Sequence, residues 1–298
     1  MYDIIIVGAG PAGLTAAIYG VRANKKVLVL ESKSYGGQIV NAYKVDNYPG
    51  MPHISGFEFA TALYNQAKEL GVEIQFETVV KIDENKNVET TKNKYQAKAI
   101  ILATGSENRR LAIENENKYV GKGISYCATC DGNFYKKKIV AVVGGGNTAL
   151  EDALYLSNIA EKVYLIHRRD TFRGEEMAAD ELRSKDNVEF ILNSNVVKLN
   201  GEKFIESIDV ENQDKEVRTI EINGLFIAVG RAPKNDIFAD VVKLDEAGYF
   251  DSPDGIHTNV KGIYVAGDAR KKELRQLATA IGDGANAATM AIKEMEKI

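Results

Sequence analysis

The sequence predicts an α/β fold of two Rossmann-like domains, the second inserted into the first. Its 298 residues exceed the about 150 typical of one domain, so we expect two domains. Two segments share the order strand, glycine loop, helix, strand, with loops starting at Gly8 and Gly144. The C-terminal segment has a strand and a long helix but no such loop, so it would complete the first domain. We expect residues 1–109 and 236–298 in the first domain and residues 110–235 in the second.

The first unit opens on an apolar, β-branched run at residues 2–7, which is typical of a buried parallel strand. The loop Gly8-Ala9-Gly10-Pro11-Ala12-Gly13, a helix at 14–23 and a strand at 26–30 ending at Glu31 follow. Such glycines permit the turn, let the backbone approach a pyrophosphate, and allow close packing of helix on strand. Glu31 would hold the ribose hydroxyls of an adenosine without a 2′-phosphate. This context disfavours the alternative of an ordinary glycine turn.

The second unit repeats this order. It has a strand at 138–143, the loop Gly144-Gly145-Gly146-Asn147-Thr148-Ala149 with alanine as a tolerated third position, and a strand at 162–166. Where the first unit has its acid, the sequence has His167-Arg168-Arg169 and, four residues on, Arg173. An acid there would repel a 2′-phosphate, whereas guanidinium groups bind it in bidentate fashion. The pattern predicts NADPH rather than NADH, against the alternative of plain solvated charge.

Further runs organise the rest of the chain. Apolar runs at 99–105 and 224–230 end on glycine, and each would close one unit. A third run at 262–268 precedes a helix from about Arg275, and the polar stretches 83–94 and 211–218 are typical of hairpins.

Composition excludes several classes of protein. With 38 Lys and Arg against 42 Asp and Glu, and 45% hydrophobic residues, the chain is neither disordered, nor collagenous, nor a polybasic nucleic-acid binder. No apolar run approaches the about 20 residues of a membrane span, and no basic-then-apolar leader opens the sequence. We therefore expect a cytoplasmic protein without nucleic-acid or membrane partners.

The two cysteines, Cys127 and Cys130, form a single C-x-x-C, which excludes a disulfide scaffold. A structural zinc site would need four ligands, and the only histidines, His53, His167 and His257, lack ligand spacing, so we expect no metal. Inert buried thiols are a second alternative. The pattern favours a redox dithiol, since such a pair can close a disulfide and a helix start lowers the thiol pKa. Asp131 could then transfer protons; the alternative is a surface acid or a first-turn helix charge.

The whole chain resembles the low-molecular-weight, bacterial-type thioredoxin reductases. Cys127-Ala128-Thr129-Cys130-Asp131-Gly132 matches the family's C-A-T-C-D-G, and residues 167–173 match its H-R-R-x-x-x-R. Segments that surround FAD in that family match at Gly36-Gly37-Gln38, at Asn47-Tyr48-Pro49-Gly50, and at Ala266-Gly267-Asp268 with Arg275-Gln276. The chain departs from the family where Asn108 replaces the frequent proline before Arg109-Arg110, which bears only on the stiffness of that linker.

The resemblance implies a homodimer that binds FAD in the first domain and NADPH in the second, with thioredoxin as partner. It implies that Cys130 is the sulfur nearer the flavin, that Asp131 is the acid/base, and that Asp268 hydrogen-bonds FAD. The helix near Arg275-Gln276 would aim its positive end at the flavin. We also expect the following residues to bind cofactor: Val80, Ala103, Thr104, Gly105, Gly230 and Leu277.

The order of the motifs predicts domain movement. Electrons would pass from NADPH through FAD to the Cys127–Cys130 disulfide and then to an outside disulfide. The dithiol and the NADPH loop share the inserted domain, yet each must come within a few ångströms of the flavin, so we expect the domain to rotate between half-reactions.

Two alternatives stay open. The same scaffold could use another donor, such as ferredoxin, or another acceptor, such as a peroxiredoxin-type partner; the intact arginine cluster argues against ferredoxin. From a different class, the protein could be a flavoprotein redox sensor that binds FAD without turnover.

Overall fold

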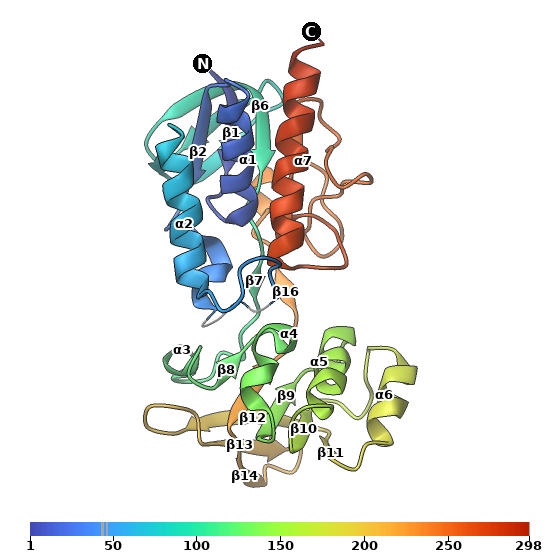
Figure 1. Cartoon of the computed structure of the whole chain (residues 1–298). Helices are drawn as coiled ribbons and strands as arrows, with labels where there is room; N and C mark the ends of the chain where they lie inside the picture. The colour runs from blue at the N-terminus through green and yellow to red at the C-terminus, as the bar shows by residue number, and fades with distance from the viewer. Residues whose placement is uncertain (43–44, 46, 298) are drawn as a thin grey trace. The chain divides into compact units, whose positions relative to one another are not determined.

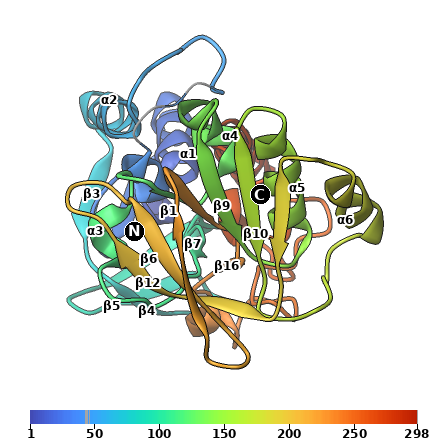
Figure 2. The same cartoon turned by 90° about the horizontal axis from the view of Figure 1, so that it is seen from below.

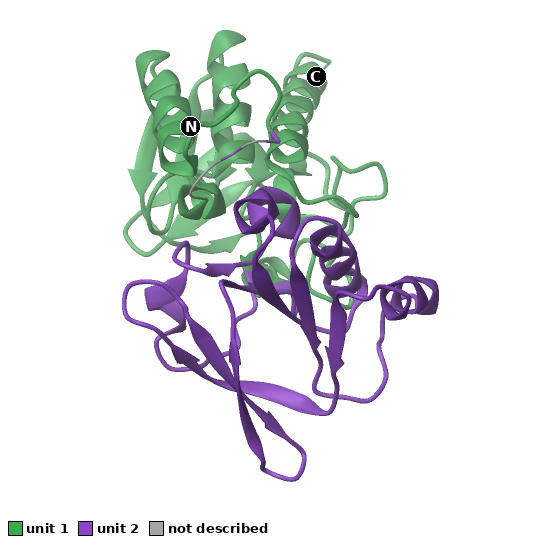
Figure 3. Ribbon diagram, turned by 60° about the horizontal axis from the view of Figure 1, so that its bottom comes forward, with its two compact units in different colours: residues 1–43, 48–107, 232–298 green, residues 44–47, 108–231 purple. Residues whose placement is uncertain are grey.

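The computed structural model describes residues 1–42, 45 and 47–297 (Figure 1). The chain divides into two compact units, residues 1–43, 48–107 and 232–298 against residues 44–47 and 108–231 (Figure 3). Each unit carries its own parallel sheet and helices, and the second is inserted into the first. The predicted fold class is confirmed.

The sheet of the first unit is mostly parallel. Its central strands β1 (Tyr2–Val7) and β2 (Val27–Glu31) pair in parallel, with Ile4 beside Val27. Strand β3 (Glu73–Phe76) adds to β2, and β6 (Lys94–Leu102) adds to the other side of β1. The C-terminal strand β17 (Ile263–Val265) pairs in parallel with β6, so the end of the chain completes this sheet, as the sequence predicts.

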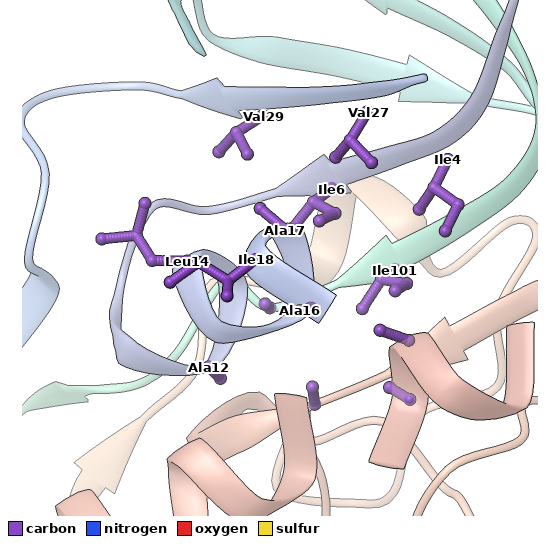
Figure 4. Packing of buried hydrophobic residues seen from close by; sticks show 14 of the residues in the cluster. Ile4, Ile6, Ala12, Leu14, Ala16, Ala17, Ile18, Val27, Val29 and Ile101 are labelled. Carbon is purple, nitrogen blue, oxygen red and sulfur yellow. The ribbon is translucent and has the colours of Figure 1, made fainter. Parts of the chain in front are cut away.

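Both faces of this sheet are covered, because alternate side chains of its strands point to opposite sides. Figure 4 shows Ile4 and Ile6 of β1, with Val27 and Val29 of β2, on the side of helix α1 (Pro11–Arg22). Ile5 and Val7 point the other way and pack with Phe238 and Phe250. Full burial of each such side chain contributes about 1.5–3 kcal/mol, so these two layers fix the position of the loop between β1 and α1.

The C-terminal helix α7 (Leu277–Met295) lies against α1 (Figure 1). Gly284 makes this close contact possible, since a Cβ there would lie 2.1 Å from the carbonyl oxygen of Ala12. The middle of α7 is thereby held against the first turn of α1. Helix α2 (Gly56–Glu69) begins with a capping box, in which Ser55 Oγ accepts from the Glu58 N–H at 3.1 Å.

The sheet of the second unit is parallel throughout. Its strands follow the order β11 (Val188–Ile191), β10 (Lys162–Ile166), β9 (Ile139–Val143), β15 (Gly224–Ile227) and β8 (Ile124–Ser125). Figure 2 shows its strands β9 (Ile139–Val143) and β10 (Lys162–Ile166) side by side. Val140 and Val142 pack on helices α5 (Asn147–Ser157) and α6 (Glu176–Arg183). The other face packs on an antiparallel sheet of β12 (Ser194–Asn200), β13 (Ser207–Asn212) and β14 (Val217–Glu221).

Short elements complete the chain. The remaining strands are β4 (Val79–Ile82), β5 (Asn87–Thr90), β7 (Glu107–Asn108), β8 (Ile124–Ser125), β11 (Val188–Ile191), β15 (Gly224–Ile227) and β16 (Arg231–Ala232). The remaining helical turns are η1 (Gly37–Asn41), α3 (Glu116–Tyr119), α4 (Ala128–Asp131), η2 (Gly132–Tyr135), η3 (Asp236–Phe238) and η4 (Gly267–Ala269). Strands β7 and β16 pair with each other where the chain passes between the units.

Some boundaries differ from the sequence prediction. Helix α1 begins at Pro11 rather than Leu14, because proline fits the first helical turn, where its missing N–H has no partner to lose. The predicted hairpin at 211–218 is confirmed by the antiparallel pair β13 and β14. The polar stretch 83–94 contains the whole of β5, which pairs in antiparallel fashion with β4 before it and with β6 after it. Within the described residues, no helix is both long enough and apolar enough to cross a membrane.

Candidate active site

Cys127 and Cys130 form a disulfide with a Cα–Cα distance of 5.3 Å. Cys127 is the N-terminal cap of α4, a single helical turn that contains Cys130. The two cysteines therefore form a disulfide, whereas the alternatives were a pair of inert buried thiols and a pair of zinc ligands. No cluster of side chains that could hold a metal ion occurs among residues 1–42, 45 and 47–297.

Asp131 lies directly after the disulfide and is partly buried rather than a fully exposed surface acid, and it stands in the single turn of α4, as the alternative of a helix charge predicts. Its Oδ2 accepts a hydrogen bond of 2.6 Å from Ser125 Oγ, while its Oδ1 is buried and has no hydrogen-bond partner among the described residues. Burial raises the pKa of Asp131, and the hydrogen bond from Ser125 opposes that rise. The arrangement is that of a carboxyl group able to hold a proton beside the sulfurs.

A second acid, Asp152 on α5, lies near α4. Burial raises the pKa of Asp152 to about 7, an effect that a hydrogen bond from the Ala128 backbone N–H opposes. Ala128 stands between the two cysteines in sequence, so this carboxyl is close to the disulfide. The sequence analysis missed Asp152, because Glu151 and Asp152 resemble any pair of acids on a helix. Nothing in the sequence indicates that α4 packs over Asp152.

The first glycine loop is shaped as the sequence predicts. Gly8 has φ +109°, and a Cβ there would lie 2.4 Å from the carbonyl oxygen of Ala103. A Cβ on Gly13 would lie 1.9 Å from the carbonyl oxygen of Gly8, so helix and strand pack too closely for any side chain. At Gly10 a Cβ would meet only the Gly37 Cα, at 4.0 Å. The loop thus leaves room at its middle glycine, where the pyrophosphate of FAD would approach.

Glu31 is held at the end of β2 beside this loop. One carboxylate oxygen accepts from the Ala9 N–H at 2.8 Å, and the other accepts from the Lys33 N–H at 2.8 Å. Two backbone donors therefore fix the acid in the place where a dinucleotide-binding unit holds the adenosine ribose. The residues of this unit fit FAD.

A buried ionic network supports the turn at Gly267 and Asp268. Asp283 of α7 accepts from the Gly267 N–H at 3.1 Å and from the Arg270 guanidinium through both oxygens, at 2.8 and 3.0 Å. Lys272, whose side chain is 6% exposed, lies 3.0 Å from Asp283 and 3.2 Å from Asp268. Sequence reasoning found Asp268 but missed Asp283 and Lys272, which belong to no motif. Each charge in the network has an opposite partner, as buried charges require.

The start of α7 lies close to the same network. Gln276 caps the helix and Leu277 is its first residue, as the sequence predicts to within two residues. The Arg275 guanidinium lies 4.2 Å from the centre of the Tyr249 ring, which fixes that side chain by a cation–π contact.

The second glycine loop repeats the first with one difference. A Cβ on Gly144 would lie 2.4 Å from the Ala228 carbonyl oxygen and 2.6 Å from the Ala149 Cβ, so alanine fits at the third position only because Gly144 has no side chain. A Cβ on Gly146 would meet nothing within 4 Å. Asn147 begins α5, and its Oδ1 accepts from the Glu175 N–H at 2.8 Å; Thr148 follows in the first turn.

His167 lies beneath this loop. A Cβ on Gly145 would lie 2.1 Å from its ring, which also stacks on Phe172 with ring centres 5.4 Å apart. Burial lowers the pKa of His167, and the neighbouring arginines lower it further, so the imidazole is neutral at pH 7. The uncharged ring packs against the loop at Gly145.

Three arginines lie in the segment that follows β10 and is tied to this loop. The Arg173 N–H donates to the Gly145 carbonyl oxygen at 2.7 Å, which ties residues 167–173 to the glycines. The side chains of Arg168, Arg169 and Arg173 are exposed, and none forms an ion pair within the described part of the chain. Free guanidinium groups at this position fit the 2′-phosphate of NADPH.

The other expected residues are placed as follows. Ala103 is buried against Gly8, Thr104 Oγ1 donates to Asn235 Oδ1 at 2.8 Å, and Gly105 has φ +72°. Val80 is 44% exposed on the outer strand β4, and the structure does not bring it to the glycine loop by any contact it shows. Asn47 is exposed, Gln38 lies in η1, and Gly230 has φ +102° at the end of the run after β15.

Two Rossmann units with glycine loops, one of them sharing its unit with a disulfide and an adjacent buried acid, define a dinucleotide-dependent disulfide oxidoreductase. The family model "Pyridine nucleotide-disulphide oxidoreductase" matches residues 2–284. The chain belongs to this family and, within it, to the thioredoxin reductases, as the following similarities show.

Relatives match over nearly their full length. The "34.2 kDa protein in rubredoxin operon" of Clostridium pasteurianum is 43% identical, covering 98% of this chain and 96% of that protein. The thioredoxin reductase of Mycoplasma genitalium is 42% identical, covering 96% and 93%. The crystal structure of thioredoxin reductase from Streptococcus pyogenes is 39% identical, with a TM-score of 0.95, and the match covers 100% of this chain and 99% of that one.

Proposed function

We propose that the protein is a flavoenzyme that uses NADPH to reduce the disulfide of thioredoxin. The observation that carries the proposal is the Cys127–Cys130 disulfide followed by Asp131, in the same unit as a glycine loop to which a segment with three exposed arginines is hydrogen-bonded. Relatives at about 40% identity that are named thioredoxin reductase support thioredoxin as the substrate.

The first unit would hold FAD. Bound there, FAD would accept a hydride from NADPH and supply two electrons to the disulfide. Gly10 would let the backbone approach the pyrophosphate, and Glu31 would bind the adenosine ribose. Asp268, which lies 3.2 Å from Lys272, would bond the ribityl or phosphate region. The N-terminus of α7 at Gln276 and Leu277 directs its positive dipole toward the flavin end of the site. Gly37, Gln38, Asn47 and residues 103–105 would make further contacts, whereas no contact among the described residues supports the expected role of Val80.

The second unit would hold NADPH. Gly144 and Gly146 cradle its pyrophosphate at the start of α5, where Asn147 and Thr148 lie. His167 supports the loop from below, and Arg168, Arg169 and Arg173 bind the 2′-phosphate. Gly230, which follows β15, would also contact NADPH.

The dithiol would reduce thioredoxin by two exchanges. One cysteine thiolate attacks a sulfur of the thioredoxin disulfide; that S–S bond breaks and a mixed disulfide forms. The second cysteine then attacks the mixed disulfide, which restores the Cys127–Cys130 bond and releases thioredoxin with two thiols. Two electrons and two protons pass to thioredoxin, and Asp131 accepts or donates a proton at the sulfurs.

The chain order supports movement of the second unit between these half-reactions. The dithiol and the NADPH loop share one unit, whereas FAD would bind in the other, and β7 and β16 carry the chain into and out of residues 108–231. Two short connections suit a hinge that presents the disulfide to the flavin in one state and the nicotinamide in the other. We further propose a homodimer in the cytoplasm.

Two matched variants test the assignment of cofactors. Gly10 and Gly146 both have ordinary negative φ, −77° and −101°, and space for a Cβ, so alanine should not strain either loop. The wild-type protein is expected to be yellow with one FAD per chain. Gly10→Ala should weaken FAD binding by about tenfold or more, because its methyl group occupies the approach of the pyrophosphate. Gly146→Ala should keep its FAD and weaken NADPH to a similar degree.

Flavin absorbance and equilibrium dialysis with FAD and NADPH measure these affinities. Loss of flavin in Gly146→Ala with normal flavin in Gly10→Ala would reverse the assignment. A colourless protein in which both loops bind NADPH would refute it.

A further inference from the structure

The hydroxyl group of Ser125 connects the disulfide segment to the acid. Ser125 is the last residue of β8 and is 4% exposed. Its Oγ donates to Asp131 Oδ2 at 2.6 Å and accepts from the Cys127 N–H at 3.1 Å. One buried hydroxyl therefore ties the carboxyl group to the backbone of the first cysteine.

This contact makes the two carboxyl oxygens of Asp131 different. Oδ2 has one lone pair engaged by the serine hydrogen, whereas Oδ1 is buried with no hydrogen-bond partner in the described part of the chain. A proton added to Asp131 is therefore placed on Oδ1, the oxygen with both lone pairs unused. We propose that Ser125 is a positioning residue, which holds Asp131 so that Oδ1 exchanges the proton with the dithiol. The proposal rests on the proposed function, in which Asp131 is the acid/base.

The same hydrogen bond sets how strongly Asp131 holds its proton. Burial raises the pKa of Asp131, and the Ser125 hydrogen bond is the one interaction that lowers it. A hydrogen bond to a charged group is strong enough that its loss should raise the pKa of Asp131 by about one unit or more. Ser125 thus makes Asp131 release its proton more readily than burial alone would allow.

Other titratable groups near Asp131 have to be distinguished from it in any pH profile. Tyr135, on η2, has a pKa raised to about 12, by burial first and by Asp131 second, and stays neutral below pH 9. Asp152, on α5, has a pKa raised to about 7 by burial, so it titrates in the working range; Glu151, its neighbour, adds to that rise. After reduction the thiols of Cys127 and Cys130 also titrate.

The test follows reduction of the disulfide by dithiothreitol in the purified holoenzyme. A dithiothreitol thiolate attacks one sulfur of the Cys127–Cys130 bond, which breaks, and the departing thiolate takes a proton from Asp131. Closure of the dithiothreitol ring then releases the second cysteine. The disulfide gains two electrons and two protons, and dithiothreitol becomes its cyclic disulfide. Alkylation and mass spectrometry give the rate between pH 5 and pH 9.

Six proteins are compared: wild type, Asp131→Asn, Ser125→Ala, Ser125→Thr, Asp152→Asn and the double variant Asp131→Asn with Ser125→Ala. Asp131→Asn should remove one limb of the pH profile, which identifies that limb. Ser125→Ala should move the same limb upward by about one pH unit or more, and Ser125→Thr, which keeps the hydroxyl, should restore it. Asp152→Asn should leave that limb in place. In the Asp131→Asn background, Ser125→Ala should change the profile no further.

The outcomes separate the two claims. If Asp131→Asn leaves every limb intact, the proposed role of Asp131 fails. If Asp131→Asn removes a limb that Ser125→Ala leaves in place, the inference about Ser125 fails alone. A lower rate in Ser125→Ala with an unmoved limb would show a merely structural role, which thermal melting of the same variants would record as lost stability.

Discussion

Replacing Cys127 or Cys130 with serine is expected to abolish reduction of thioredoxin, while NADPH still reduces the bound flavin. A single thiol can form a mixed disulfide but cannot resolve it, so electrons stop at the flavin. The effect should be complete, because the chain has no other cysteine to replace the missing thiol. Stopped-flow absorbance measures flavin reduction, and a turnover assay with thioredoxin measures the rest of the reaction.

Met177→Ala provides the control, since Met177 is 78% exposed on α6 of the same unit and belongs to neither site. It should match wild type in both assays. If the serine variants also lose flavin reduction, the cysteines lie on the path of the nicotinamide or hold the fold. If they keep thioredoxin reduction, the dithiol is not the site of exchange.

The double variant Arg168→Ala with Arg169→Ala is expected to bind NADPH about a hundredfold more weakly and NADH almost unchanged. Each guanidinium group that loses a charged hydrogen bond to the 2′-phosphate costs about 1.5–3 kcal/mol, which is tenfold or more per residue. Because both side chains are exposed, the difference should shrink as salt is added. Steady-state KM values for the two nucleotides measure the discrimination.

Arg183→Ala is the matched control. It removes one arginine from the same unit, but Arg183 is paired with Glu176 and Asp180 on the surface of α6. Its KM for NADPH should stay near wild type. Equal losses for NADPH and NADH in the double variant would mean that Arg168 and Arg169 support the fold and do not read the phosphate.

The glycine loops and the strands around them could be predicted from the sequence because their signals are local. A buried parallel strand is a continuous apolar run, and Gly8 and Gly144 must adopt positive φ where the chain turns into a helix. The inserted domain could be predicted for a similar reason, since only one end of the chain lacks a glycine loop. The arginines at the end of β10 were found because their position relative to the loop is fixed.

The contacts that tune the site could not be predicted in this way. Ser125 lies on a two-residue strand, and its bond to Asp131 depends on how β8 leads into α4. Asp283 reaches Gly267 only because α7 packs on α1 through Gly284. These contacts join segments through tertiary packing, and neither residue type nor spacing distinguishes them from surface polar residues.

The most direct test of the central claim measures NADPH oxidation by the purified flavoprotein with oxidised thioredoxin present or absent. We expect continuous oxidation only with thioredoxin present, with one NADPH consumed for each thioredoxin disulfide converted to two thiols. Without thioredoxin, NADPH should reduce the flavin and then stop. Reduced flavin that does not pass electrons to thioredoxin, or turnover that requires reduced ferredoxin in place of NADPH, would contradict the claim.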